Sequence, residues 1–290
     1  MSTALRPAYR LRGNTFLRGS VSSRSGQLGL AVVVLICAVA FLGPLASPYS
    51  PTDTVGVPFT GPSGAHIVGT DGLGRDGLSR FLYGGRALIV VAFLATALAY
   101  VVGIPLGMAA GYRRGLFDLT TVAVADLILS FPPIVFVLVL LAAAGPHLSI
   151  VVASIATIHA PRVMRISRSV TIDIATQEFV EAAVARGESL LSILRHDILP
   201  NIWTPVLADF GIRLTGSVIL FSSLSYLGLG QPPPAADWGL MISENRTGLL
   251  VQPWIVIVPA VTIALLAIGV NLVADAIARS VGRSVVGRDV

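Results

Sequence analysis

The sequence predicts an all-α integral membrane protein with six transmembrane helices and both termini in the cytoplasm. The first observation is composition: of 290 residues, 54% are hydrophobic and 12% are charged, whereas about 25% are charged in an average soluble domain. The mean hydropathy is +0.82. The second observation is a series of apolar runs of the length that crosses a bilayer. The third is the distribution of the arginines between the two sides of these runs.

The apolar runs define the expected spans, which lie near residues 28–46, 87–111, 119–144, 148–168, 202–227 and 252–277. The fourth is the weakest, because arginines follow Pro161. Basic residues precede the first run, as in a signal peptide, but a 27-residue leader and five later spans favour a retained helix. Residues 1–27 are then a cytoplasmic segment.

Orientation follows from the arginines, since cytoplasmic loops carry the excess of basic residues. With both termini inside, fifteen arginines are cytoplasmic and four are extracytoplasmic, while Arg213 falls within the fifth span. The reverse orientation would invert this bias. Residues 47–86 become an extracytoplasmic loop, 87–282 a core of five spans, and 283–290 a cytoplasmic tail.

The extracytoplasmic loops have their own signals. Residues 47–86 begin rich in proline and glycine, which predicts irregular structure. An amphipathic helix lying along the membrane surface is expected next, with apolar Leu73, Leu78, Phe81 and Leu82 on one face and Arg75, Asp76 and Arg80 elsewhere. Trp238 and Trp254, in and after the loop 228–250, are expected at the membrane interface.

The cytoplasmic segment "EFVEAAVARGESLLSILRHDILPN" is polar and helix-forming between apolar spans. Thr176 is expected to cap a first short helix that ends at Gly187. Ser189 is expected to cap a second helix that stops before Pro200. Such a pair would form a compact projection. Its apolar faces fit either lipid headgroups or a groove on a cytoplasmic partner.

Missing residue types restrict the chemistry. All 20 basic residues are arginines, and the lysine that a P-loop requires is therefore lacking. ATP and Mg²⁺ would have to be bound by partner subunits, and we expect no cofactor on this chain. Cys37, the single cysteine, excludes an internal disulfide. The four histidines lack metal-ligand spacing, and no nucleophile, base and orienting group converge, so neither a metal site nor a catalytic residue is expected.

Polar and small residues inside the spans predict packing and a transport path. Asp209 and Arg213 are four apart on one helix and can neutralise each other. They, together with Asp126 in the third span, either form a structural pair or border a translocation path. Gly103, Gly107 and Gly111 predict close helix packing. Pro132 and Pro133 predict a bend in the third span.

The cytoplasmic segment resembles the EAA loop of bacterial ABC-importer permeases. "EAA", Gly187 six residues after Glu181, and "ILPN" carry the match. "GTDGLGRDGLSRFLYGGR", "GYRRGLFD", "DLILSFPPI" and "SYLGLGQPPPAADWG" are similar to the C-type subunit of oligopeptide, dipeptide and nickel importers, so the resemblance covers roughly residues 26–282. It implies the type I importer permease fold with cytoplasmic coupling helices. One departure is Arg186, where the family commonly has a hydrophobic or small residue.

The resemblance also implies residue roles. Glu181 would orient the docking helix, Ala182 and Ala183 would allow close approach, Gly187 would provide a joint, and Pro200 would set the turn into the fifth span. The residues implied in coupling to an ATPase are Glu178, Glu181, Ala182, Ala183, Arg186, Gly187, Leu199 and Pro200.

Partners and cargo follow from the same resemblance. A second, B-type permease, two nucleotide-binding ATPase subunits or domains, an extracytoplasmic substrate-binding lipoprotein and membrane lipids are implied, and no nucleic acid is. The location implied is the inner membrane. Oligopeptides or dipeptides are the expected cargo, with nickel or glutathione as alternatives. A different class, an ion-coupled secondary transporter, would need internal repeats, and the halves of the chain show no convincing one.

Overall fold

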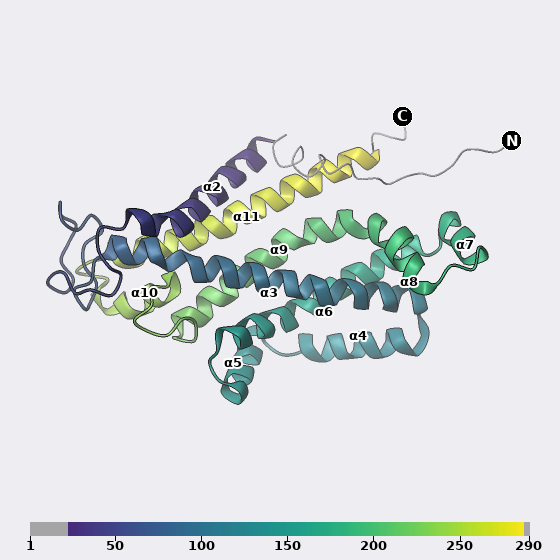
Figure 1. The fold of residues 1–290 in the computed structure, drawn as a ribbon, viewed down its shortest axis with the longest axis horizontal. Helices are drawn as coiled ribbons and strands as arrows, with labels where there is room; N and C mark the ends of the chain where they lie inside the picture. Colours follow the sequence, from purple (N-terminus) through teal and green to yellow (C-terminus); the bar gives the residue numbers. More distant parts are fainter. Residues whose placement is uncertain (1–22, 287–290) are drawn as a thin grey trace.

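The computed structural model describes residues 23–286 and shows an elongated bundle of helices (Figure 1). Within that range the backbone forms no strand, and isolated β-bridges occur only in the segment before α3. The α-helices are α2 (Arg24–Leu42), α3 (Gly77–Arg113), α4 (Gly115–Leu129), α5 (Pro133–Ala144), α6 (Leu148–Ile174), α7 (Glu178–Ala185), α8 (Leu190–Ser192), α9 (Leu199–Tyr226), α10 (Trp238–Asn245) and α11 (Trp254–Val286). The short helices η1 (Gly43–Ala46), η2 (Ile193–Ile198) and η3 (Arg246–Gly248) complete the order.

Among the described residues, five helices are long and apolar enough to cross a membrane: α2, α3, α6, α9 and α11. The pair α4 and α5 passes the same test together, but the two helices meet at 90°. The bend was predicted, and its cause is local. Pro132 and Pro133 lack N–H groups, and Phe131 before them is driven out of helical geometry. Six spans are present if this pair counts as one.

Helices α3 and α6 pack closely because α3 presents glycines to α6. A Cβ atom on Gly103 would lie 2.8 Å from the carbonyl oxygen of Ala160, and one on Gly107 would lie 2.4 Å from that of Met164. Gly111 meets the carbonyl oxygen of Arg168 in the same way, at 2.7 Å. The predicted packing role of the three glycines is therefore confirmed, since only residues without a Cβ allow this approach.

The separate surface helix predicted around residues 73–82 is wrong. This segment is the start of α3, which Asp76 caps by accepting a hydrogen bond of 2.8 Å from the Ser79 N–H. Its polar face is turned inward: Arg80 is fully buried, whereas the apolar Leu73 is 62% exposed. Charge partners elsewhere in the fold explain the reversal.

Those partners are Asp71 and Glu244. The Arg80 guanidinium lies 3.1 Å from Asp71 Oδ2 and 2.8 Å from Glu244 Oε2. Arg75 contacts the same two carboxylates, at 2.6 and 3.0 Å. A buried charge is tolerated only when it is paired and hydrogen-bonded. The network fastens the segment before α3 to α10, and together they form a folded cap at one end of the bundle.

Trp238 is also not at the membrane interface as predicted. Its ring is fully buried, stacks on Phe81 with centroids 5.4 Å apart, and donates from Nε1 to the Phe81 carbonyl oxygen at 2.8 Å. Trp254, in contrast, is 50% exposed. The indole of Trp238 therefore anchors α10 to α3 inside the cap.

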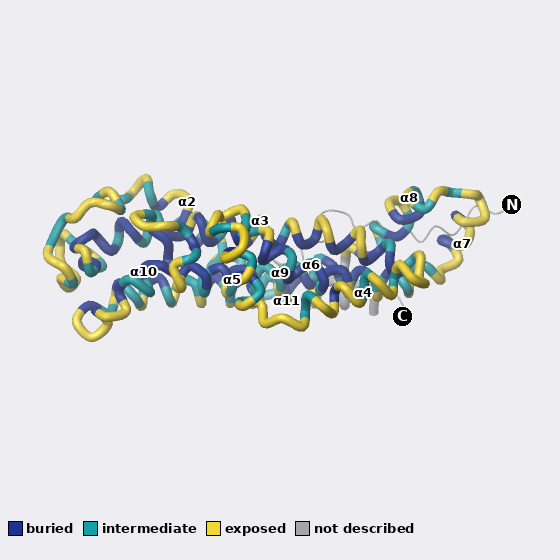
Figure 2. The backbone as a smooth tube through the Cα atoms, turned by 90° about the horizontal axis from the view of Figure 1, so that it is seen from below, coloured by how far each residue is buried: buried dark blue, intermediate teal, exposed yellow. Residues whose placement is uncertain are grey.

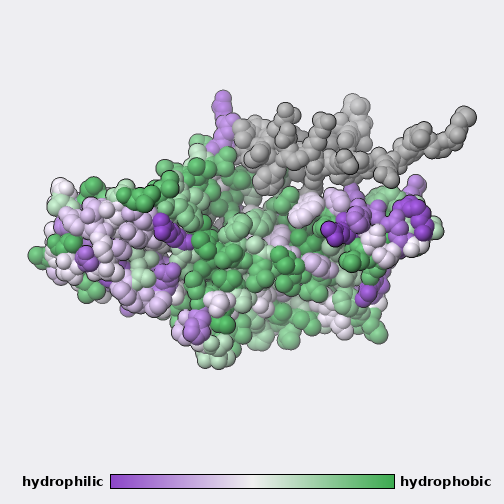
Figure 3. Space-filling view, viewed as in Figure 1, coloured by the Kyte–Doolittle hydropathy of each residue, from purple (hydrophilic) through white to green (hydrophobic). Residues whose placement is uncertain are grey.

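The surface supports a membrane-spanning orientation. Apolar side chains cover the central part of the molecule, and hydrophilic side chains gather at the cap and at the opposite end, where α7 and α8 lie (Figure 3). Ser25 near the start of α2 accepts a hydrogen bond of 2.9 Å from Arg279 on α11, so these two helix ends lie together. The predicted terminal segments 1–27 and 283–290 fall mostly outside the described residues.

Candidate functional site

Helices α7 and α8 form a projection beyond the bundle, at the end opposite the cap (Figures 1 and 2). We call residues 178–200 the knob. Gly187 has φ +77°, a left-handed conformation that glycine adopts without strain, and its N–H donates to the Val184 carbonyl oxygen at 2.9 Å. Ser189 caps α8, as predicted. The predicted Thr176 cap is wrong, because the N-cap of α7 is Gln177, without a side-chain hydrogen bond.

The predicted break before Pro200 is absent. The chain is helical without interruption from Leu190 to Tyr226, passing through the π-helical turns of η2. Leu199 N–H bonds to the Leu194 carbonyl oxygen five residues back. These wider turns accommodate Pro200, which has no N–H and whose ring would clash with the carbonyl of residue 196 in a regular α-helix. Pro200 lies in the first turn of α9 and does not turn the chain.

One face of the knob is packed and the other is open. Val180 and Ala183 of α7 are buried in a cluster with Ile193, Leu194 and Ile198. Glu178, Glu181 and Ala182 are exposed, and so are two large apolar side chains, Val184 at 52% and Leu191 at 74%. The buried face holds the knob together, which leaves the open face available for a partner.

Arg186 is held locally. Its guanidinium lies 2.7 Å from Glu188 Oε1, and Glu188 in turn accepts a hydrogen bond of 3.0 Å from the Ser192 hydroxyl. The hydrogen bond from Arg186 lowers the pKa of the Glu188 carboxyl. The Arg186 side chain therefore stabilises the turn around Gly187 from the solvent side.

The predicted pair on the fifth span is formed. Arg213 Nη2 lies 2.9 Å from Asp209 Oδ1, and Tyr100 on α3 donates its hydroxyl to Asp209 Oδ2 at 2.9 Å. Tyr100 was missed by sequence reasoning, because its contact with Asp209 joins residues that are 109 apart in the chain. This triad ties α9 to α3.

Asp126 lies elsewhere, on α4. It pairs with Arg165 of α6, and both side chains are about half exposed. One helical turn further along α6, Arg168 contacts Asp118 of α4, with Arg168 Nη2 2.6 Å from Asp118 Oδ2. The three-residue spacing of Arg162, Arg165 and Arg168 was the signal in the sequence that could have suggested ion pairs along one face of this helix.

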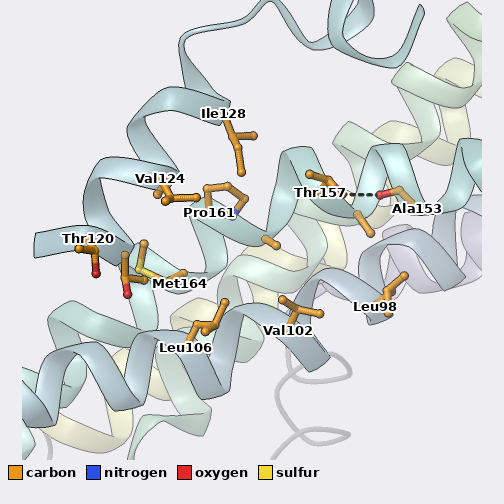
Figure 4. A pocket seen from close by; sticks show the side chains of 14 residues that line it. Leu98, Val102, Leu106, Thr120, Val124, Ile128, Ala153, Thr157, Pro161 and Met164 are labelled. Carbon is orange, nitrogen blue, oxygen red and sulfur yellow. Dashed lines mark hydrogen bonds between the residues drawn. The ribbon is translucent and has the colours of Figure 1, made fainter. Parts of the chain in front are cut away.

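An apolar cavity of about 440 Å³ lies among α3, α4 and α6 (Figure 4). Val102, Val124 and Met164 are among its lining residues, and the hydroxyls of Thr120, Thr121 and Thr157 are its polar contribution. Neither the Asp209–Arg213 pair nor Asp126 lines it. Such a lining suits packing in a bilayer and offers no group for chemistry on a substrate. No group of three or more potential metal ligands occurs within the described residues.

A helical bundle with an apolar waist and a projecting knob defines a multi-pass membrane protein (Figure 3). The chain belongs to the family of binding-protein-dependent transport system inner membrane components, whose family model matches residues 103–285. It is therefore a multi-pass inner-membrane protein and a component of a transporter. The family implies a second permease and ATPase subunits as partners.

Two relatives and one solved structure show the breadth of the similarity. The chain is 33% identical over 250 residues to the dipeptide transport system permease protein DppC of Alkalihalophilus pseudofirmus, covering 86% of this chain and 82% of the relative. It is 31% identical over 274 residues to the glutathione transport system permease protein GsiD of Pectobacterium atrosepticum, covering 94% and 90%. An inward-facing structure of the MetNI methionine ABC transporter shares the fold, with TM-score 0.56, 18% identity, and 68% of this chain and 94% of that one covered.

Proposed function

We propose that this chain and a second, B-type permease enclose a path for the uptake of oligopeptides or dipeptides, driven by ATP hydrolysis in partner subunits. The dipeptide permease among its relatives supports this cargo class. Nickel and glutathione are the alternatives within the family, and a glutathione permease is also among the relatives. An ion-coupled secondary transporter is the alternative from another class.

The knob is the observation that carries the proposal. Leu191 and Val184 of the knob are exposed, and the end of the molecule with α7 and α8 lies beyond the apolar central surface (Figure 3), so lipid tails would not cover them. Exposed apolar side chains on a folded projection mark a docking surface. A groove on each ATPase subunit would receive this face, with Ala182 allowing close approach and Glu181 at its edge.

The helical continuity from Leu190 to Tyr226 supplies a route for the motion. When ATP and Mg²⁺ bring two ATPase subunits together, each ATPase subunit would move the permease knob that is docked in it. Because η2 joins the knob to α9 without a loop, the displacement would pass directly to the helix that carries Asp209 and Arg213. Gly187 is the joint that lets α7 tilt separately. A continuous helix thus passes through Pro200, where a turn into the fifth span was expected.

ATP hydrolysis is assigned to partners because the chain has no lysine for a P-loop. The cap at the other end of the bundle would receive the substrate-binding lipoprotein. Its ion network, in which Arg80 is fully buried between Asp71 and Glu244, would hold that surface rigid while the spans move.

Reconstitution tests the proposal. The chain is placed in proteoliposomes with a second permease, the ATPases and the binding protein of the same transport system, and uptake of a labelled dipeptide is measured with ATP or with a non-hydrolysable analogue. Uptake should require all components and hydrolysable ATP. Uptake by this chain without ATPases, driven by an ion gradient, would identify a secondary transporter instead.

A further inference from the structure

Helix α6 carries three arginines at three-residue spacing, and one of them, Arg162, has no counter-ion among the described residues. Arg165 pairs with Asp126 and Arg168 with Asp118, both on α4. Arg162 forms no ion pair with any described residue, and its hydrogen bond to the Ile158 carbonyl oxygen is 3.5 Å long. An ionised side chain inside a span costs about 2.5–3.5 kcal/mol on insertion scales. An unpaired one therefore needs water or a ligand.

Arg162 lies on the part of α6 that packs against α9. It is one helical turn after His159, whose ring lies against Gly216 of α9, and Gly216 is three residues after Arg213. Asp209 is already engaged by Arg213 and by the Tyr100 hydroxyl, each at 2.9 Å. This part of the bundle therefore holds two guanidinium groups and one carboxylate, a net positive charge. We call Arg162, Arg213 and Asp209 the anion station.

His159 adds a second, independent observation. It lies one helical turn before Arg162, is 5% exposed, and neither ring nitrogen has a hydrogen-bond partner. Its ring faces α9, because Cε1 would lie 3.1 Å from a Cβ atom on Gly216. A buried polar group without a partner costs roughly 1–3 kcal/mol. Such a group beside an unpaired cation indicates a site that is completed in another state of the transport cycle.

We propose that the anion station binds the terminal carboxylate of a peptide moving along the path. This inference rests on the proposed function. The Arg213 side chain is 19% exposed and Arg162 is partly exposed. Both belong to helices long and apolar enough to cross a membrane, where charged side chains face a water-filled or protein-lined space rather than lipid. Guanidinium groups bind carboxylates through paired hydrogen bonds. The C-terminal carboxylate is common to all unmodified peptides, so one station serves many sequences, whereas a free nickel cation would be repelled.

The test compares uptake of one dipeptide as the free acid and as the C-terminal amide. Wild type, Arg162→Gln, Arg162→Lys and Arg165→Gln are assembled with the same partners and binding protein. Only the permease differs, so preferences of the binding protein cancel. We expect Arg162→Gln to lower the ratio of acid to amide uptake about tenfold, the size of a partly solvated charge-assisted hydrogen bond. Arg162→Lys should retain most of the preference. Arg165→Gln, which removes an arginine that is already paired with Asp126, should retain all of it.

A carboxylate side chain of the second permease has the same chemistry as a peptide terminus. In that case Arg162→Gln would lower acid and amide uptake equally, which would overturn the proposal. Asp209→Asn changes the charge of the anion station in the opposite direction, and it provides the test if the Arg162→Gln variant does not assemble. By adding net positive charge it should raise the ratio, and an unchanged or lower ratio would contradict the station. Failure of the wild-type assembly to take up any peptide would instead overturn the proposed function.

Discussion

Gly187 forms the joint between α7 and α8, and its backbone geometry sets the cost of replacing it. Its φ is +77°, and a Cβ atom built there would meet nothing within 4 Å. Space is therefore not limiting. Alanine should cost about 1 kcal/mol for the left-handed conformation, and asparagine less, because it tolerates that region. Proline fixes φ near −65° and loses the N–H that now bonds to Val184, which should cost about 3 kcal/mol or more.

The assay is the amount of peptide taken up per ATP hydrolysed by the reconstituted importer. Gly187→Asn should stay within about twofold of wild type, Gly187→Ala should fall slightly, and Gly187→Pro should lose at least about tenfold, because about 3 kcal/mol far exceeds the 1.4 kcal/mol of a tenfold change. Membrane amounts of all three should be similar, since Gly187 lies outside the packed core. Full coupling in Gly187→Pro, with normal assembly, would refute the role of the joint.

Three further substitutions test separate parts of the structure. Leu191→Asp should reduce co-purification of the ATPases at least about tenfold without changing membrane insertion, because it puts a charge on the 74%-exposed docking face; unchanged co-purification would remove this face from the interface. Arg80→Ala should destabilise the cap by about 3–5 kcal/mol, the cost of breaking a buried ion pair, seen as a lower Tm in detergent that the exposed control Arg246→Ala does not show. Gly107→Leu should prevent accumulation, since its Cβ atom would lie 2.4 Å from a backbone oxygen of α6; Gly61→Leu, in open space, should accumulate normally.

Features that depend on neighbours in sequence were predicted well. Gly187 and Ser189 fix their turn and cap through their own backbone and hydroxyl, and the glycines of α3 show their packing face by spacing alone. Pro132 and Pro133 predict a bend, because proline acts on its immediate neighbours. The angle of 90° depends on what α4 and α5 pack against, and the sequence does not contain that information locally.

Features that depend on distant partners were not predicted. Arg75 and Arg80 have the pattern of a polar helix face, and their burial depends in part on Glu244, 164 residues beyond Arg80, which completes the network with Asp71. Trp238 resembles an interfacial tryptophan until its stacking on Phe81 is seen. Pro200 is a local exception: it was expected to stop a helix, but the π-helical turns directly before it remove the clash.

Docking of an ATPase on the knob is the central claim, and site-specific cross-linking tests it most directly. In a Cys37→Ser background, Leu191→Cys and Leu250→Cys place one thiol each on the knob and on the opposite end, where Leu250 is 98% exposed. With the assembled importer and a thiol-to-amine cross-linker, the ATPase should be captured from Leu191→Cys and not from Leu250→Cys. Capture from Leu250→Cys, or none from Leu191→Cys while ATP-driven uptake is intact, would contradict it.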